Sequence, residues 1–389
     1  MNKPLKILIF NWQDKTHPLA GGAEIYLHEI FSRMARNHQV TLFCCSYEGA
    51  KGEEIIDGIK IIRRGKRNLS NFTSFWWYLV SGRKQKYDVV VEFANKAPYL
   101  SPLWIFRPKR VVAQMHFNGS TFLLEKPILG KILFSIEKML FWFYKREQFV
   151  VISESTREDM KNYHLPNEKA EVVYPGILTG SVGRKEKTEF PSVLCVSRLK
   201  KYKSVDLLIR AFAKVLQKLP NAKLLLAGSG NQKEELEKLA SDLEILGSIN
   251  FLGKVSEEEK FDLYASAWVN VLPSQKEGWG MTVLEAARMG TTSIASRVSG
   301  LRETMEDGKS GILIEYGDEA ALVSAIIKIL SDENLRSLFE KGAFSYSENF
   351  SWENSAKKFE DFLVKYCCYG KKALAEGKSA EKTALSSGF

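Results

Sequence analysis

The sequence has few cysteines, and their arrangement indicates neither a disulfide framework nor a metal site. Five cysteines occur in 389 residues, as Cys44-Cys45, Cys195 and Cys367-Cys368, without C-x-x-C or zinc-ligand spacing. An odd number that includes adjacent pairs favours reduced thiols in a cytosolic compartment. We therefore expect a cytoplasmic protein that holds no metal.

Long hydrophobic runs are also absent. No stretch reaches the roughly 18 to 20 apolar residues that a helix needs to span a bilayer. The apolar run at residues 7–10 is too short to be the core of a secretory signal. No internal repeat is evident. These absences argue against a membrane-spanning, secreted or repeat protein.

Acidic residues are fewer than basic ones. The chain has 56 Lys and Arg against 46 Asp and Glu, which gives a net charge of +10. This charge suggests anionic partners, such as nucleoside diphosphates, phospholipid headgroups, lipid-linked phosphates or nucleic acid. Because no nucleic-acid recognition motif accompanies the charge, we expect no nucleic-acid partner. The length suits two domains of ordinary size.

The first residues predict a βαβ unit. Residues 5–11 (LKILIFN) and 40–45 are apolar runs typical of buried parallel strands, and residues 25–36 have the spacing of an amphipathic helix. Gly21 and Gly22 are expected in the loop before this helix, at the carboxyl edge of the sheet, where ligands bind. The two glycines either turn the chain or let the backbone approach a phosphate or an acceptor.

A histidine follows a later strand of the same predicted sheet. Residues 88–93 (DVVVEF) and 110–115 (RVVAQM) have the composition of buried strands, and His116 comes directly after the second. It is therefore expected at the ligand edge. A histidine there either has a purely structural role, with its hydrogen bonds made within the protein, or contacts a substrate.

The next segment is rich in aromatic and basic residues. Residues 117–149 include FLLEKPILGKILFSIEKMLFWFYKREQF, in which apolar residues recur at helical spacing between basic ones. Such a helix either lies in a membrane interface, with its basic groups on anionic lipid, or packs against its own sheet with its lysines in water. In the first case, residues 76–86 extend the same surface. The residues alone leave both alternatives open.

Two cations follow the first predicted strand of the second half. Residues 193–196 form that strand, Arg198 follows it, and Lys203 precedes a helix predicted over residues 205–216. Cations at a strand end and helix entry can neutralise a diphosphate leaving group without a metal. Taken alone, they are equally consistent with ordinary surface residues.

The segment VLPSQKEGWGMTVLEAARMG predicts a buried strand, a glycine-rich loop and a helix. Glu277 lies in the loop, the helix begins at about Met281, and Glu285 lies on it. Loop amides at such a helix start favour an anion. Both carboxylates can border one pocket, which would suit a nucleotide sugar. Alternatively, this is a common α/β connection with Glu285 on a solvated face.

The same segment, K-E-G-W-G-M-T-V-L-E-A-A-R-M-G, resembles the E-x7-E signature of retaining GT-B glycosyltransferases of the group 1, family 4 type. The resemblance implies that Glu277 contacts the donor sugar and that the following amides contact sugar and phosphate. It also implies that Glu285 binds the ribose hydroxyls. Trp279 replaces the usual phenylalanine.

Further segments resemble the same family. S-R-L-K-K-Y-K-S-V-D-L-L-I-R-A-F is similar to its G-R-L-x-x-x-K-G block, and G-G-A-E to its first loop. His116 resembles its strand-end histidine, with Phe117 where Gly or Asp is usual. The catalytic residues that the resemblance implies are His116, Arg198, Lys203 and Glu277. The donor-binding residues that it implies are Gly21, Gly22, Arg198, Lys203, Gly228, Gly253, Lys254, Glu277, Gly278, Trp279, Gly280, Met281, Thr282 and Glu285.

The resemblance implies an α/β protein with the GT-B fold, in which two Rossmann-like domains with parallel sheets face a central cleft. The acceptor-side domain is expected at residues 1–178, with a helix at 351–368 that packs back on it. A polar linker is expected at residues 179–191, the nucleotide-sugar domain at 192–350, and a disordered, lysine-rich tail at 370–389.

The implied reaction is transfer of a hexose from a nucleoside diphosphate sugar to an acceptor hydroxyl, with retention of anomeric configuration. The acceptor would be a glycan or a lipid-linked one, in synthesis of a cell-surface polysaccharide, glycolipid or lipid-linked glycan. The enzyme would need no cofactor or metal, and could bind the inner face of the cell membrane through residues 117–149. Alternatives are a non-catalytic nucleotide-sugar or membrane-lipid scaffold, a sugar phosphorylase and a nucleotide-sugar epimerase.

Overall fold

The chain divides into two compact units. The computed structural model describes residues 3–94, 97–117, 119, 127–177 and 186–368. Unit 1 consists of Met1–Gly119, Lys131–Gly176 and Trp352–Phe389, and unit 2 of Ser120–Gly130 and Ile177–Ser351. Most of the predicted linker and all of the predicted tail lie outside the described residues. No helix in the described ranges is long and apolar enough to cross a membrane.

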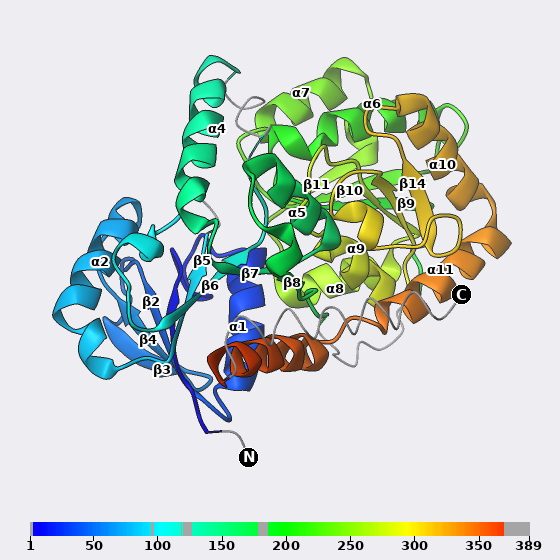
Figure 1. The fold of residues 1–389 in the computed structure, drawn as a ribbon. Coiled ribbons are helices and arrows are strands. Elements are labelled where there is room, and N and C mark those ends of the chain that lie inside the picture. The colour runs from blue at the N-terminus through cyan, green and yellow to red at the C-terminus, as the bar shows by residue number, and fades with distance from the viewer. Residues whose placement is uncertain (1–2, 95–96, 118, 120–126, 178–185, 369–389) are drawn as a thin grey trace. The chain divides into compact units, whose positions relative to one another are not determined.

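Unit 1 contains an eight-stranded sheet in the order β3-β4-β2-β1-β5-β6-β7-β8 (Figure 1). All neighbouring strands are parallel except β3 and β4. The strands are β1 (Lys6–Phe10), β2 (Gln39–Cys44), β3 (Glu53–Ile56), β4 (Ile59–Arg63), β5 (Val89–Phe93), β6 (Lys109–Gln114), β7 (Gln148–Val151) and β8 (Ala170–Val172). The α-helices α1 (Gly22–Met34), α2 (Ser70–Val80) and α5 (Glu154–Asp159) belong to this unit, as does α4 (Pro127–Phe141) from Lys131 onward.

The central strands of unit 1 are buried on both faces. β5 is buried along its whole length, and β1 is buried from its second residue onward. A strand covered on both faces needs apolar side chains at every position, and such runs were the signal that predicted these strands. The strand predictions at residues 5–11, 40–45, 88–93 and 110–115 are therefore confirmed, with boundaries shifted by a residue or two.

The antiparallel β3–β4 hairpin was not predicted. Asp57 and Gly58 join its strands, and both have positive φ, of 47° and 82°. An Asp-Gly pair in this conformation is a strong signal for a two-residue hairpin, because its twist matches that of the flanking strands. The signal was present in the sequence but was not used.

The first helix begins earlier than predicted. Gly21 to Glu24 were expected in a loop, but α1 starts at Gly22 and Gly21 is its N-cap. The Glu24 carboxylate accepts a hydrogen bond from the Gly21 amide at 2.8 Å. This side chain thereby satisfies an amide of the helix end, as in a capping box, and the helix extends to Gly22.

A C-terminal helix over residues 352–368 belongs to unit 1 (Figure 1). It lies beside α1, where the rings of Phe31 and Phe359 meet with centroids 5.1 Å apart. Arg33 pairs with Glu353 at 2.9 Å along the same contact. The return of the chain thus completes the core of unit 1.

Unit 2 contains a six-stranded parallel sheet in the order β11-β10-β9-β12-β13-β14. The strands are β9 (Ser192–Val196), β10 (Lys223–Ala227), β11 (Ile249–Gly253), β12 (Val269–Leu272), β13 (Ser293–Ser296) and β14 (Gly311–Ile314). The principal helices are α6 (Val205–Leu216), α7 (Lys233–Asp242), α8 (Glu257–Ser266), α9 (Met281–Arg288), α10 (Glu319–Ser331) and α11 (Glu333–Ser347). The strand order reverses between β9 and β12, and ligands bind at such switch points.

Helices α6 and α10 cover the core of unit 2. Leu208, Ile209 and Phe212 of α6 are fully buried, in one cluster with Ile326 and Ile329 of α10. The predicted bounds of α6 are confirmed because its apolar residues repeat at helical spacing throughout. α10 and α11 were not predicted.

We expect Phe359→Ala to destabilise unit 1 by about 3 to 5 kcal/mol, because it removes a fully buried ring that packs against α1. Hydrogen exchange of the β1 amides should accelerate, while the β9 amides of unit 2 keep their protection. Lys357→Ala, at an exposed position of the same helix, is the control. Equal acceleration in both units would contradict the assignment of this helix to unit 1.

Candidate functional site

The candidate site lies at the switch point of unit 2. Two loops meet there, one at residues 197–204 after β9 and one at residues 273–280 after β12. Parallel strands present their carboxyl ends at one edge of the sheet, and adjacent strands whose helices leave to opposite faces open a crevice between them. The predicted residues Arg198, Lys203 and Glu277 all lie in these loops.

An ion pair joins the two loops. The Lys203 ammonium donates to the Glu277 carboxylate, and both side chains are almost completely buried. The Ser274 hydroxyl donates to the same carboxylate oxygen at 2.8 Å. The Gln275 amide donates to the Tyr202 carbonyl at 2.9 Å, so the backbones of the loops are also joined. The structure therefore brings together two predicted residues 74 positions apart.

Arg198 lies at the exposed end of the first loop. Its guanidinium donates to the Tyr202 hydroxyl at 2.8 Å. The Lys203 ammonium lies 5.4 Å from the centre of the same ring, within cation–π range. Tyr202 therefore contacts both predicted cations. An exposed guanidinium beside a buried ammonium provides two donors for an anion that enters from solvent.

Glu285 is buried on α9. Lys260 approaches one of its carboxylate oxygens at 3.2 Å, and the Tyr264 hydroxyl donates to the other at 3.2 Å. Burial and the adjacent Glu285 charge both raise the pKa of Tyr264, so its hydroxyl stays a proton donor. The alternative in which Glu285 lies on a solvated face is therefore wrong.

Two glycines allow backbone segments to approach the site closely. A Cβ atom on Gly228, after β10, would lie 1.8 Å from the Ser197 carbonyl oxygen. A Cβ on Gly300 would lie 2.7 Å from the Glu277 carbonyl oxygen and 2.8 Å from the Gly278 carbonyl. Both glycines also have positive φ. Any side chain at these positions would push the β9 or β12 loop out of place.

The second loop leads into α9, as predicted. Gly280 is the N-cap with φ of 100°, Met281 is the first helical residue, and no side chain of the described residues caps this end. The Thr282 hydroxyl in the first turn is buried without a hydrogen-bond partner among them. Trp279 is buried, with its ring 5.5 Å from that of Phe350. This helix start is electrostatically suited to an anion.

The remaining predicted residues of unit 2 lie toward one side of the sheet. Gly228 follows β10, the neighbour of β9, and its amide donates to the Gly253 carbonyl at 2.6 Å. Gly253 ends β11, the edge strand, and Lys254 follows it with an exposed side chain. These three residues therefore extend the same carboxyl edge away from the switch point.

Three predicted residues lie in unit 1. Gly21 and Gly22 start α1, which follows β1, and the Glu24 carboxylate lies against the Gly21 amide. His116 follows β6 and is partly buried, and its carbonyl accepts from Gln114 at 2.5 Å. All three thus lie at the carboxyl edge of the unit 1 sheet, as the strand order requires.

The unusual Phe117 has a structural role. Its ring is fully buried, stacks on Tyr163 at 4.2 Å and meets Phe141 edge to face at 5.1 Å. A glycine or aspartate here would leave a cavity against α4. The residue after His116 therefore anchors the start of this connection in the core.

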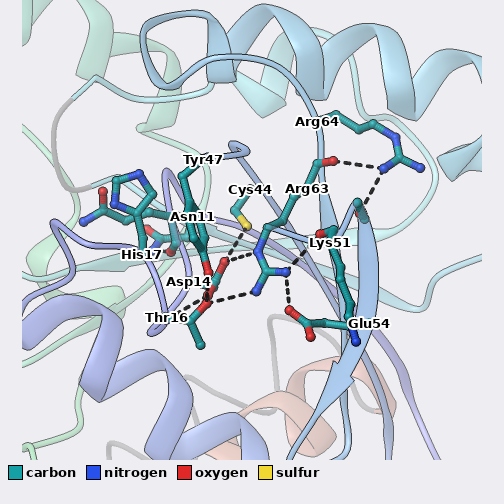
Figure 2. A network of polar contacts seen from close by, with 12 residues as sticks. Asn11, Asp14, Thr16, His17, Cys44, Tyr47, Lys51, Glu54, Arg63 and Arg64 are labelled. Atoms are coloured by element: carbon teal, nitrogen blue, oxygen red, sulfur yellow. Dashed lines mark hydrogen bonds and ion pairs between the residues drawn. The ribbon is translucent and has the colours of Figure 1, made fainter. Parts of the chain in front are cut away.

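A buried polar network supports the loop after β1 (Figure 2). The Arg63 guanidinium donates to Asp14 at 2.6 Å and also contacts Glu54, while the Asp14 carboxylate accepts from the Thr16 hydroxyl at 2.5 Å. The Cys44 thiol donates to Asp14 at 3.4 Å. Burial alone would raise the pKa of Asp14, but the hydrogen bonds from Arg63 and Thr16 outweigh it and lower that pKa to about 2.

Sequence reasoning missed four side chains that contact the predicted residues. Tyr202 and Ser274 carried no signal beyond their place in the two loops. Lys260 and Tyr264 are four residues apart on α8, so they share one face, but nothing in the sequence indicated which element that face meets. In the described part of the chain, no three His, Cys, Asp or Glu side chains form a group that could hold a metal ion.

Two family models match the chain. Residues 182–345 match the model described as Glycosyl transferases group 1, and residues 20–180 match Glycosyltransferase Family 4. The first covers the two loops and α9, and the second covers the α1 start and His116.

Curated relatives extend over nearly the whole chain. An uncharacterized glycosyltransferase of Methanocaldococcus jannaschii is 26% identical over 384 residues, which cover 91% of this chain and 96% of that protein. The GDP-mannose-dependent alpha-(1-6)-phosphatidylinositol monomannoside mannosyltransferase of Mycolicibacterium smegmatis is 25% identical over 381 residues, with 89% and 95% covered. Among solved structures, sucrose-phosphate synthase from Thermosynechococcus elongatus superposes with a TM-score of 0.78 at 20% identity, covering 93% of this chain and 98% of that one. The structural likeness shows a shared fold.

We expect the stability contributed by Asp14 to depend on pH. Its pKa is lower in the folded protein than its usual 3.8, so its contribution is complete above about pH 5 and is lost as the pH falls toward 2. Asp14→Asn should therefore lower the free energy of unfolding of unit 1 by about 2 kcal/mol or more at pH 7. The difference from wild type should fall by about half between pH 5 and pH 3. Hydrogen exchange of the β1 amides gives the measurement, and a pH-independent difference would contradict the network.

Proposed function

Because the chain belongs to the group 1 glycosyltransferases of family 4 and has their GT-B fold, we propose that it moves a hexose from a nucleoside diphosphate sugar to an acceptor hydroxyl with retention of anomeric configuration. The observation that carries this proposal is the contact of Lys203 with Glu277 across the switch point of unit 2. It combines a cation for phosphate and a carboxylate for sugar hydroxyls at the place where this fold binds nucleotides.

The donor binds chiefly to unit 2. Arg198 and Lys203 contact the diphosphate, and the start of α9 adds its amides at Met281 and Thr282. Glu285 accepts hydrogen bonds from the ribose hydroxyls and is held for this by Lys260 and Tyr264. The mannosyltransferase relative is by its name GDP-mannose-dependent, which supports a nucleoside diphosphate sugar as donor.

Departure of the diphosphate is assisted by side chains rather than by a metal ion. As the bond between the anomeric carbon and the phosphate oxygen breaks, negative charge grows on the diphosphate. The preorganised Arg198 and Lys203 cations stabilise this charge more strongly than they stabilise the intact donor. The proposed enzyme therefore needs neither a divalent ion nor an organic cofactor.

The acceptor attacks from the face that the diphosphate leaves. A double displacement would use the Glu277 carboxylate as nucleophile, but Lys203 and Ser274 both bind one of its oxygens and withdraw negative charge from it. Instead, the acceptor oxygen forms the new bond to the anomeric carbon, and its proton passes to the departing phosphate oxygen. Glu277 holds the transferred sugar, with His116 facing it from unit 1.

The acceptor is a lipid-linked or cell-surface glycan. The name of the mannosyltransferase relative gives phosphatidylinositol monomannoside as its acceptor, which is a lipid-linked sugar. An acceptor of this chemistry would bring the protein to the inner face of the cell membrane from the cytoplasm.

We test a panel of uridine, guanosine and adenosine diphosphates by calorimetry with EDTA present. We expect one of these nucleoside diphosphates to bind. Arg198→Ala combined with Lys203→Ala should weaken that binding by about a hundredfold or more, because two charge-assisted contacts are lost. Lys201→Ala removes an exposed cation of the same turn and should leave the affinity unchanged. Absence of binding across the panel would instead support the non-catalytic membrane-lipid scaffold.

We expect Glu277→Gln to slow hydrolysis of the bound donor by about 10- to 100-fold, because the neutral amide binds sugar hydroxyls more weakly. Affinity for the free nucleoside diphosphate should stay the same or increase, since the carboxylate contacts the sugar and its neutralisation leaves the Lys203 ammonium free for phosphate. Release of nucleoside diphosphate gives the rate, and Glu306→Gln, at an exposed position, is the control. Full activity of Glu277→Gln would contradict its role.

A further inference from the structure

Helix α2 carries an apolar stripe that faces away from the core. Phe72, Trp76 and Val80 recur at helical spacing, and each is at least half exposed. The core-facing side of the same helix is separate, with Tyr78 buried and Trp77 stacked on Phe43 at 4.7 Å. The exposed stripe is therefore additional to the apolar residues that hold α2 on the sheet.

Helix α4 and the turn after it carry a second stripe of the same kind. Ile132, Ile136, Met139 and Trp142 are exposed and recur every three or four residues. The opposite face packs within unit 1 through the fully buried Phe141. One face of this helix therefore packs on its own unit, and the other presents exposed apolar side chains.

Residues 101–106 of unit 1 contact both α2 and the turn that follows α4, which are labelled or lie beside labels in Figure 1. Trp104 contacts Phe75 of α2 with ring centroids 5.6 Å apart. The turn just before it, Ser101–Leu103, packs against Trp142–Tyr144, the turn that follows α4. Phe106, two residues after Trp104, is 78% exposed. We call one set of side chains the basic apolar surface. It consists of the exposed apolar side chains of α2, of residues 103–106 and of α4 through Trp142.

The exposed charges around these side chains all have one sign. Within residues 64–87, 101–107 and 127–146, every exposed charged side chain is a lysine or an arginine. The single carboxylate of these segments, Glu137, is buried and accepts hydrogen bonds from Tyr163 and the Gly119 amide. An apolar surface of this composition needs a partner that is apolar inside and anionic at its boundary.

We propose that the basic apolar surface binds the headgroup layer of an anionic membrane. The exposed indoles of Trp76 and Trp142 suit the interfacial layer, the aliphatic side chains enter the acyl boundary, and the lysines and arginines contact lipid phosphates. A second copy of the chain fits less well. In a symmetric contact the surface would face itself, and its uniform positive charge would repel. The inference does not depend on the transferase reaction, because vesicles free of donor and acceptor suffice to test it.

The apolar part is tested by co-sedimentation of the full chain with vesicles of phosphatidylcholine alone or with phosphatidylglycerol. The anionic vesicles should bind the wild type at least about tenfold more tightly. Trp76→Ser combined with Trp142→Ser should weaken this binding by about tenfold or more. Leu246→Ser combined with Leu338→Ser removes two exposed apolar side chains from unit 2 and should leave binding unchanged. Equal losses for the two pairs would overturn the proposal.

The basic part is tested by charge reversal in the same assay. Lys84→Glu combined with Lys145→Glu should weaken binding to anionic vesicles by about tenfold or more, and moderate salt should do the same. Lys218→Glu combined with Lys238→Glu changes the net charge equally on unit 2, and its effect should be much smaller. Equal affinity for neutral and anionic vesicles would overturn the proposal. Self-association of the wild type that the Trp76 and Trp142 substitutions abolish would also overturn the proposal.

Discussion

Two buried charges of opposite sign hold the centre of unit 2 together. Lys203 and Glu277 lie in loops that leave adjacent strands, and each would be a costly isolated charge without the other. Breaking such a pair by removing one partner typically costs about 3 to 5 kcal/mol. The pair therefore fixes both loops before any ligand arrives. In the proposed reaction, this places the cation at the leaving group and the carboxylate at the sugar without reorganisation.

The same pair limits what each group can do chemically. A carboxylate that is bound to an ammonium and a hydroxyl is a poor nucleophile, which favours direct displacement with the diphosphate as base. An ammonium shared with a carboxylate binds phosphate less strongly than a free one. The exposed Arg198, held by Tyr202 at the entrance, is the complementary cation that supplies the remaining charge. The loops can adopt this arrangement only because Gly228 and Gly300 leave room for the neighbouring backbone.

Much of this fold could be predicted from the sequence because its strands are buried on both faces. The bounds of α6 and the start of α9 were correct, since each has an uninterrupted apolar pattern beside a clear loop. The β3–β4 hairpin at Asp57-Gly58 was not predicted because β3 is a partly exposed edge strand without a continuous apolar run. The helical pattern predicts a start at residue 25, three residues late, because glycine is typical of loops and the capping role of Glu24 depends on the backbone conformation at Gly21.

The candidate site was predictable only through motif resemblance. Its residue types were identified, but contacts between distant segments were not. Nothing in the spacing showed that Lys203 meets Glu277, and nothing assigned Lys260 and Tyr264 to the Glu285 carboxylate. The local pattern of α9 also left its buried face ambiguous. Long-range side-chain pairing depends on strand order, which a single sequence does not determine.

Everything proposed for this protein depends on a nucleotide sugar that binds at the switch point of unit 2. The most direct measurement is a crystal structure of the full chain with the nucleoside diphosphate sugar for which it has the highest affinity. We expect the diphosphate within hydrogen-bond distance of Arg198, Lys203 and the first amides of α9, with the ribose hydroxyls on Glu285. A nucleotide bound elsewhere, with Glu285 still enclosed by Lys260 and Tyr264 alone, would contradict it.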